Sequence, residues 1–181
     1  NNNTLSFNPG PDNLVNAIAP NSGATSLLVG GEFIKANGIV NPGFGGFNKT
    51  TGATTIAGNV YDTAAVWALV RQGDGKTIVA GDFYLNGGGG VVYRSLARLN
   101  ANDTLDTGWN PLVDGQVVTA ALSGNTVLIG GSFTAVGATS RANLAAVDLT
   151  TGLATSFNAN VNGIVNTVVV DGTNAYIGGQ F

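Results

Sequence analysis

One motif recurs four times along the chain and limits the folds that the chain can adopt. Each copy is a short apolar run followed by Gly or Ala, then Gly, one variable residue and Phe. The closing residues of the four copies are Phe33, Phe83, Phe133 and Phe181, at intervals of 50, 50 and 48 positions. A period of this length indicates one supersecondary unit per copy, and neighbouring units must stack to bury a continuous core.

Each period contains further short segments in the same order. An alternating apolar segment comes first, then a turn rich in Gly, Asp, Asn or Ser, and then the apolar run of the motif. A third apolar segment follows, and a fourth ends in an aromatic residue before Asn in most repeats. The first segments cover residues 15–18, 66–69, 117–120 and 165–168; the third cover 45–48, 96–100 and 144–148; the fourth end at Phe7, Trp109 and Phe157. Short strands with Gly-rich turns predict an all-β fold, a β-propeller of four-stranded antiparallel blades.

The segments amount to about three and three-quarter blades within a single β-propeller region, residues 1–181. The expected order is an outer strand of a preceding blade (1–12), three blades (13–62, 63–113 and 114–162) and a partial blade (163–181). Because propellers typically have four to eight blades, we favour a segment of a larger ring. A four-bladed ring closed by the N-terminal strand, and several chains that complete a ring or fibre, are the alternatives.

The Phe that closes each motif is predicted to act as a wedge between blades. The Gly-Gly or Ala-Gly pair before it is expected to admit an adjacent backbone or to form a β-bulge. These two roles would explain much of the high Gly content, 28 residues in the chain.

The composition excludes several kinds of site. The chain has no Cys, His or Met, which rules out disulfides, zinc sites built on Cys or His, and catalytic triads with His. Charged residues make up 9% of the chain and the formal net charge is −3, which argues against a nucleic-acid partner. The longest apolar run, residues 64–70, is too short for a membrane span. We expect no cofactor, and the low Lys and Glu content favours an extracellular or cell-surface protein.

Two acidic and two aromatic residues are candidates for ligand binding. Glu32, the sole Glu, and Asp82 occupy the variable position of their motifs. Such positions ring a propeller at one depth, so the two carboxylates would be neighbours and would suit glycan hydrolysis, although a role in blade structure is favoured. Trp67 and Trp109 would stack on a sugar, although both are more typical of the core between blades.

Asn100, Asn102, Asp103 and Asp106 form the best local group of oxygen ligands, with a spacing that loosely resembles a calcium loop. The group lacks the terminal bidentate Glu of such loops. Hydrogen bonds within a turn are the favoured interpretation, because Asn and Asp side chains bond nearby backbone groups there. No metal ion is therefore predicted.

The second repeat carries the fullest set of motifs. They are Asp74-Gly75-Lys76, Gly81-Asp82-Phe83, Arg94, Leu96-Ala97-Arg98-Leu99-Asn100 and Trp109-Asn110-Pro111. The third repeat keeps Arg141 and the Gly-Gly-x-Phe motif but lacks Asp-Gly-Lys and the second Arg, and the first repeat lacks both Arg residues. This set resembles the bacterial propeller repeats called delta-sixty repeats, over nearly the whole chain. The resemblance implies a secreted or surface-exposed bacterial propeller and implies no activity.

We therefore expect a non-enzymatic extracellular or cell-surface β-propeller module with a structural, adhesive or self-assembling role. Its partners would be other copies of the chain or the rest of a longer polypeptide, with polysaccharide as a further candidate. A carbohydrate-binding, lectin-like propeller is the alternative. A glycan hydrolase that uses Glu32 and Asp82 is the third hypothesis.

Overall fold

The computed structural model describes residues 7–21, 25–57 and 65–181. Every secondary-structure element assigned within these ranges is a β-strand, and the strands pair antiparallel. No helix long and apolar enough to cross a bilayer is found among the described residues. The predicted all-β fold is thus confirmed.

Four main sheets follow one another along the chain. The first contains β1 (Val15–Pro20), β2 (Ser26–Gly31), β5 (Phe44–Asn48) and β6 (Thr54–Ala57). The second contains β7 (Ala65–Arg71), β8 (Thr77–Asn86) and β9 (Val92–Leu99). The third contains β10 (Gln116–Ser123), β11 (Thr126–Ser132) and β14 (Leu144–Asp148). The fourth contains β15 (Val165–Asp171) and β16 (Asn174–Gly179).

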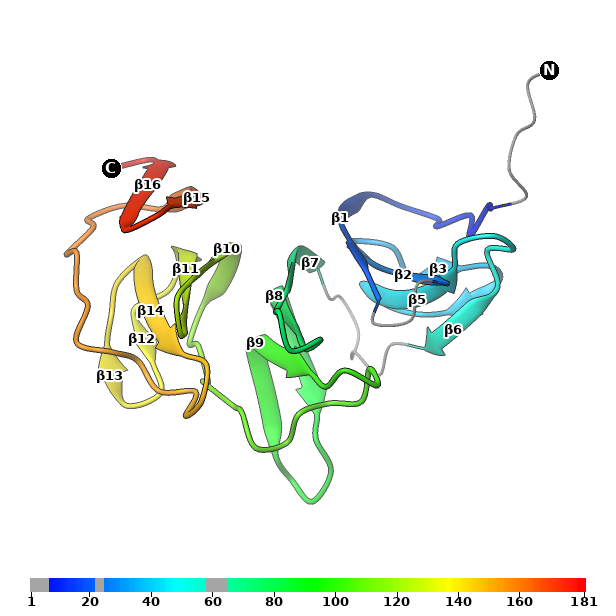
Figure 1. Cartoon of the computed structure of the whole chain (residues 1–181), viewed down its shortest axis with the longest axis horizontal. Helices are drawn as coiled ribbons and strands as arrows, with labels where there is room; N and C mark the ends of the chain where they lie inside the picture. Colours follow the sequence, from blue (N-terminus) through cyan, green and yellow to red (C-terminus); the bar gives the residue numbers. More distant parts are fainter. Residues whose placement is uncertain (1–6, 22–24, 58–64) are drawn as a thin grey trace.

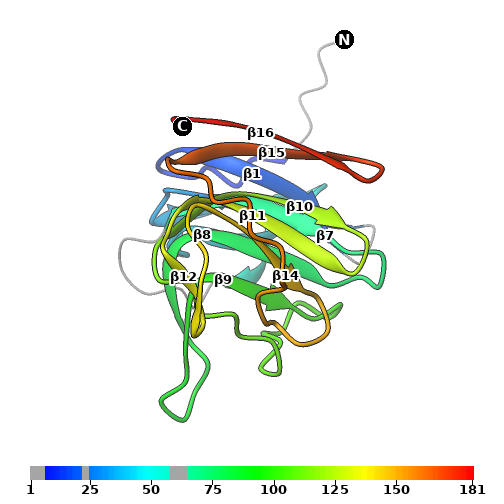
Figure 2. The ribbon, with the colours of Figure 1, turned by 90° about the vertical axis from the view of Figure 1, so that its left-hand side faces the viewer.

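The main sheets stand side by side along an open arc (Figure 1). Their first strands, β1, β7, β10 and β15, line the inner side of this arc, and each contacts the next. Figure 2, turned by 90°, shows these inner strands running roughly parallel to one another. The repeats therefore pack as consecutive units around a common axis, each through the faces of its sheet.

Two small hairpins extend the connection between the second and third strands of a repeat. They are β3 (Lys35–Ala36) with β4 (Ile39–Val40), and β12 (Ala135–Val136) with β13 (Thr139–Ser140). In the second sheet, β8 and β9 themselves continue into a longer hairpin. These hairpins are not predictable from the sequence, because pairs as short as two residues have no clear alternating pattern.

The fourth strand of each repeat is where the structure differs from expectation. Among the described residues, only the first sheet has a fourth paired strand, β6. In the second and third sheets the described residues show one isolated bridge each, Leu99–Leu105 and Val147–Ala154. The chain then leaves its own sheet, since the indole of Trp109 donates a hydrogen bond to a carbonyl of the third sheet, at 3.0 Å. The second and third sheets thus have three strands each among the described residues, and in the second repeat the aromatic end of the fourth segment, Trp109, packs on the next sheet.

The same crossing occurs at the start of the described chain. Residues 7–12 form no strand, and Phe7 packs against a cluster that includes Phe33 and Phe47 of the first repeat. The proposed outer strand at residues 1–12 is therefore not present in its described part, and residues 1–6 lie outside the described ranges.

Separate apolar clusters join neighbouring sheets. Phe83 lies in the cluster between the first and second sheets, and Phe133 lies in the cluster between the second and third. Phe33 is buried within the first repeat, whereas Phe181, which follows β16, is 55% exposed. Tyr93 belongs to the cluster of Phe83, and Val136 belongs to the cluster of Phe133. The four Phe residues of the motif therefore differ in their surroundings from repeat to repeat.

The first Gly of the motif allows two sheets to approach closely. A Cβ placed on Gly30 would lie 2.4 Å from Cγ1 of Val66 in the next sheet, and a Cβ on Gly130 would lie 2.6 Å from Cγ1 of Val165. Both valines are fully buried. Glycine at these positions therefore leaves the space that the inner strand of the following sheet fills.

The second Gly of the motif lies opposite a β-bulge in all four repeats. A Cβ on this residue would lie 2.0 Å from a backbone carbonyl oxygen of the segment entering the first strand; the pairs are Gly31–Leu14, Gly81–Ala65, Gly131–Gln116 and Gly179–Ile164. The register of the first strand shifts at the same level, which leaves one residue unpaired: Asn16, Trp67, Val118 and Asn166. The prediction that the Gly pair admits an adjacent backbone is confirmed. The alternative, that the pair itself forms a β-bulge, is not, because the bulge residue belongs to the partner strand.

Candidate functional site

A notch opens between the first and second main sheets, where β2 ends and β7 begins. Its volume is about 380 Å³, and its lining includes Asn13, Glu32, Ile34, Pro42 and Trp67. We call it the Glu32–Trp67 notch. It brings together two of the residues that the sequence singled out separately, one acidic and one aromatic.

The β-bulge explains why Trp67 reaches this notch. Val66 is fully buried and pairs with Gly81, whereas Trp67 is the unpaired residue of the bulge and is half-buried. A bulge redirects the side chain of its extra residue away from the alternation of the strand. Trp67 therefore lines the mouth of the space between two sheets, which simple strand alternation did not predict.

Glu32 is held at the notch by two asparagines of its own repeat. Asn16, the bulge residue of β1, donates from Nδ2 to Oε1 of Glu32 over a long 3.4 Å. Asn13 donates from Nδ2 to the carbonyl oxygen of Glu32 at 3.3 Å, and its Oδ1 accepts the amide of Leu14 at 2.8 Å. These bonds fix the backbone at Glu32 and leave its exposed carboxylate at the rim.

Asp82 has the equivalent position in the second repeat but a different surrounding. Its Oδ2 accepts a hydrogen bond from Nε2 of Gln116, the first residue of β10, at 2.9 Å. Asp82 is not part of the lining of the Glu32–Trp67 notch. Glu32 thus lies at the junction between the first and second sheets, and Asp82 lies at the junction between the second and third. The hydrolase hypothesis had placed these two carboxylates together.

Trp109 is fully buried in the cluster between the second and third sheets, so its ring is not available to a sugar. The guanidinium of Arg98 stacks on this ring, 4.8 Å from its centroid. Arg98 also donates from Nη1 to the carbonyl of Leu149 in the third repeat, and from Nε to Oδ2 of Asp106 at 2.9 Å. Arg98 belongs to a sequence motif of the second repeat, but no role was predicted for it. The signal that could have found it is a charged residue between apolar strand positions.

Asp106 is the acidic partner of this group, and 13% of its side chain is exposed. Lys76 Nζ and Arg98 Nη2 lie 2.9 and 2.8 Å from its Oδ2. Burial by itself would raise the pKa of Asp106, but the hydrogen bonds and charges of the two cations outweigh it and hold the pKa below its usual value. We call Arg98, Asp106, Lys76 and Trp109 the Arg98 clamp.

The four residues of the calcium hypothesis do not converge on one point through their hydrogen bonds. Asn100 Nδ2 donates to Oγ1 of Thr104, Asn102 Oδ1 accepts from the same residue, and Asp103 accepts from Asn21 of the first repeat. Asp106 belongs to the Arg98 clamp. Within the part of the chain that the structure describes, no group of three or more acidic side chains that could hold a metal ion is found.

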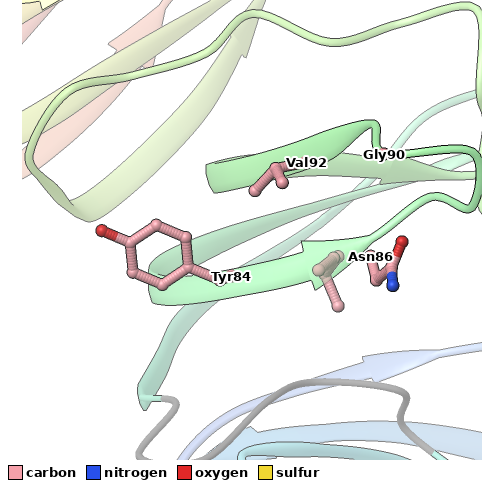
Figure 3. A pocket seen from close by; sticks show the side chains of 5 residues that line it. Tyr84, Asn86, Gly90 and Val92 are labelled. Atoms are coloured by element: carbon pink, nitrogen blue, oxygen red, sulfur yellow. The ribbon is translucent and has the colours of Figure 1, made fainter.

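A second hollow lies beside the long β8–β9 hairpin. It has a volume of about 300 Å³ and is lined by Tyr84, Leu85, Asn86, Gly90 and Val92. Figure 3 shows Tyr84 and Val92 on the two neighbouring strands, with Asn86 and Gly90 nearer the turn. Tyr84 is 47% exposed and carries the guanidinium of Arg94 at 5.3 Å from its ring centroid. The described lining of this hollow contains no acidic or basic residue, so it offers no charged group to a ligand or to catalysis.

Comparisons with known proteins bear on the fold. A family model described as "Domain of unknown function (DUF5122) beta-propeller" matches residues 72–108. The crystal structure of the computationally designed Ika4 protein is similar over 94% of this chain and 88% of that chain, with a TM-score of 0.58 and 14% sequence identity. A search of curated proteins found no match. Together with the repeated antiparallel sheets, these similarities indicate a β-propeller domain.

Proposed function

We propose that the chain is a non-enzymatic β-propeller module of the delta-sixty-repeat type, exposed at the cell surface or outside the cell, with a structural, adhesive or self-assembling role. In this proposal each main sheet is a blade. Low charge, absent Cys and His, and repeats that pack through their faces all suit a rigid scaffold whose loops meet a partner.

The non-enzymatic role is supported chiefly by the hydrogen bonds and ion pairs that four aspartate carboxylates make within the fold. Asp12 accepts the amides of Ile34 and Lys35 at 2.8 and 2.9 Å, and Asp114 accepts those of Thr134 and Ala135 at the same distances. Asp148 caps the turn after β14, and Asp106 joins the Arg98 clamp. Side chains that would otherwise be candidates for acid–base chemistry therefore support turns and junctions.

Light scattering at increasing protein concentration tests the assembling role. Species larger than one chain should appear as the concentration rises, and a strict monomer at high concentration would contradict self-assembly. Hydrolysis assays on a broad glycan panel, with wild type and Glu32→Gln, test the absence of catalysis. Activity in the wild type that is lost in the variant would overturn the non-enzymatic role.

Carbohydrate binding is the second candidate, and the presence of Trp67 beside Glu32 and Asn13 in one notch favours it. Aromatic faces stack on sugar rings, and carboxylates and amides bond their hydroxyls. A glycan array probed with wild type and Trp67→Ala tests this role. Loss of a specific glycan signal in the variant would support it, and absence of any wild-type signal would count against it.

A further inference from the structure

The Glu32–Trp67 notch has no chemical equivalent at the other described junctions between sheets. The position of Glu32 is taken by Asp82 and Ser132 in the next two repeats, and the bulge position of Trp67 is taken by Val118 and Asn166. At the second junction the carboxylate of Asp82 is hydrogen-bonded to Gln116 at 2.9 Å. A carboxylate facing the same space as an indole is thus particular to the first junction.

The lining of the notch is otherwise apolar. Two of its lining residues have polar side chains, Asn13 and Glu32. The others are Phe33, Ile34, Pro42, Ala65 and Trp67. Both ends of the Asn13 amide are already bonded to backbone groups, those of Glu32 and Leu14. The carboxylate of Glu32 accepts a long hydrogen bond of 3.4 Å from Asn16, and it is the one charged group among the described residues that line the notch.

We propose that this notch binds an alkylammonium group. The positive charge would lie against the carboxylate of Glu32, and the apolar body would lie against Trp67 and Ile34. Indole rings attract cations through their electron-rich faces, and a carboxylate at the same site adds a direct charge contact. A volume of about 380 Å³ lies within the range of small-molecule sites.

A neutral sugar fits this lining less well than a cation does. A sugar presents hydroxyl groups on several sides, and each buried hydroxyl needs a hydrogen-bond partner. The notch supplies one carboxylate and an asparagine whose amide is engaged. An alkylammonium ion needs one charge partner and apolar walls, which are the features present. This inference goes beyond the proposed scaffold role, which light scattering tests independently.

Titration of the ¹⁵N-labelled 181-residue chain with choline, n-butylammonium and 3,3-dimethyl-1-butanol, followed by NMR, tests the proposal. The first two probes separate a quaternary headgroup from a lysine-like side chain, and the third has the shape of choline without its charge. The indole signals report on both tryptophans, since Trp109 is buried and hydrogen-bonded while Trp67 lines the notch. A Trp67→Phe sample assigns the two signals. We expect at least one cation to shift the Trp67 signal, with an affinity on the order of 1 mM, and the neutral analogue to bind roughly tenfold more weakly.

Glu32→Gln keeps the shape of the side chain and should weaken cation binding by about tenfold. Asp82→Asn is the matched control, because it changes the equivalent carboxylate outside the notch, and it should leave the affinity unchanged. The unshifted signal of Trp109 verifies that each variant is folded. The proposal would be overturned by equal binding of choline and its neutral analogue, by an equal loss of affinity in the two variants, or by the absence of a shift with all three probes.

Discussion

Arg98 illustrates, at the scale of single residues, how one side chain can join two sheets. Its planar guanidinium stacks on Trp109, pairs with Asp106 and reaches a carbonyl of the third repeat. Only 7% of this side chain is exposed, so the pair is largely protected from solvent. A buried charge with this many partners contributes more than a surface ion pair, and removal of one partner leaves the other unpaired.

Replacement of Arg98 by Lys should lower the free energy of unfolding by about 2 kcal/mol, because an ammonium reproduces neither the stacking nor the divergent hydrogen bonds. Urea denaturation followed by fluorescence measures the change. Arg94→Lys is the control: that guanidinium stacks on the exposed Tyr84, and the cost should stay below about 1 kcal/mol. Equal losses in the two variants would contradict the clamp.

The pKa of Asp106 gives the clamp a pH dependence. Because the folded-state pKa lies below the usual value of 3.8, ionised Asp106 stabilises the fold above that pH. The contribution is lost as the pH falls through the folded-state pKa. The difference in free energy of unfolding between wild type and Asp106→Asn should therefore be constant from about pH 7 to pH 5 and shrink below about pH 4.

Urea titrations of both proteins at each pH provide this difference. The comparison with the variant is needed because the pKa values of Asp12, Asp114 and Asp148 are also lowered. Burial opposes the effect at all three and is the largest single influence at Asp114, but the hydrogen bonds that the carboxylates accept outweigh it. Both proteins thus lose stability in acid for shared reasons. A difference that stays constant down to pH 2 would show that Asp106 does not carry the predicted charge contact.

At the scale of elements, the β-bulge of the first strand is the feature that recurs in each repeat. It lets the segment entering the strand cross the second Gly of the motif, and it directs the unpaired side chain toward the junction between sheets. The β-bulge therefore allows close packing against the second Gly of the motif and also exposes the side chain of Asn16 or Trp67. The residue at that position is free to vary, because the ladder does not pair it.

Gly81→Ala should destabilise the chain by about 3 kcal/mol or more, since the added Cβ would lie 2.0 Å from the carbonyl oxygen of Ala65. Gly73→Ala is the matched control. Gly73 lies in a turn with open space around it, and its substitution should change stability by less than about 0.5 kcal/mol. Thermal and urea unfolding of the two variants measure these effects. A tolerated Gly81→Ala would mean that the bulge is not tightly packed.

At the scale of the whole molecule, stability is distributed unevenly along the arc. The second and third sheets share the cluster that contains Trp109, Ile129 and Phe133, and the Arg98 clamp closes the same junction. The fourth sheet presents exposed apolar residues such as Val169 and Tyr176, at 57% and 59%. Sheets that are covered on both faces should open less often than a sheet that is covered on one.

Hydrogen exchange measured by mass spectrometry should therefore be slowest in β8 and β11. Paired amides of β15 and β16 should exchange at least about tenfold faster, since local opening there disrupts fewer buried contacts. The Arg98→Lys variant should accelerate exchange in β9 and β14 more than in β1 and β2. Uniform exchange along the chain would indicate a single cooperative unit instead.

The repeat and the strands were predictable because both depend on local pattern. Alternating apolar residues, Gly-rich turns and a period near 50 residues placed the first three strands of the first three repeats, and the two strands of the fourth, correctly to within a few residues. The fourth segment of the first repeat forms the paired strand β6, but the fourth segments of the second and third repeats were not predicted correctly. In the second repeat the choice between pairing at an outer edge and packing Trp109 on the next sheet depends on contacts made across repeats.

The sequence by itself determined an all-β repeat structure, and it excluded sites that need Cys, His or Met. Tertiary structure alone decided which of the singled-out residues meet. Trp109 is buried beneath Arg98, Asp82 accepts a hydrogen bond from Gln116, and Trp67 lies beside Glu32 in one notch. The physical reason is that a periodic pattern specifies which face of a strand is buried. One unpaired bulge residue, opposite the second Gly of the motif in the same repeat, redirects a side chain out of that pattern.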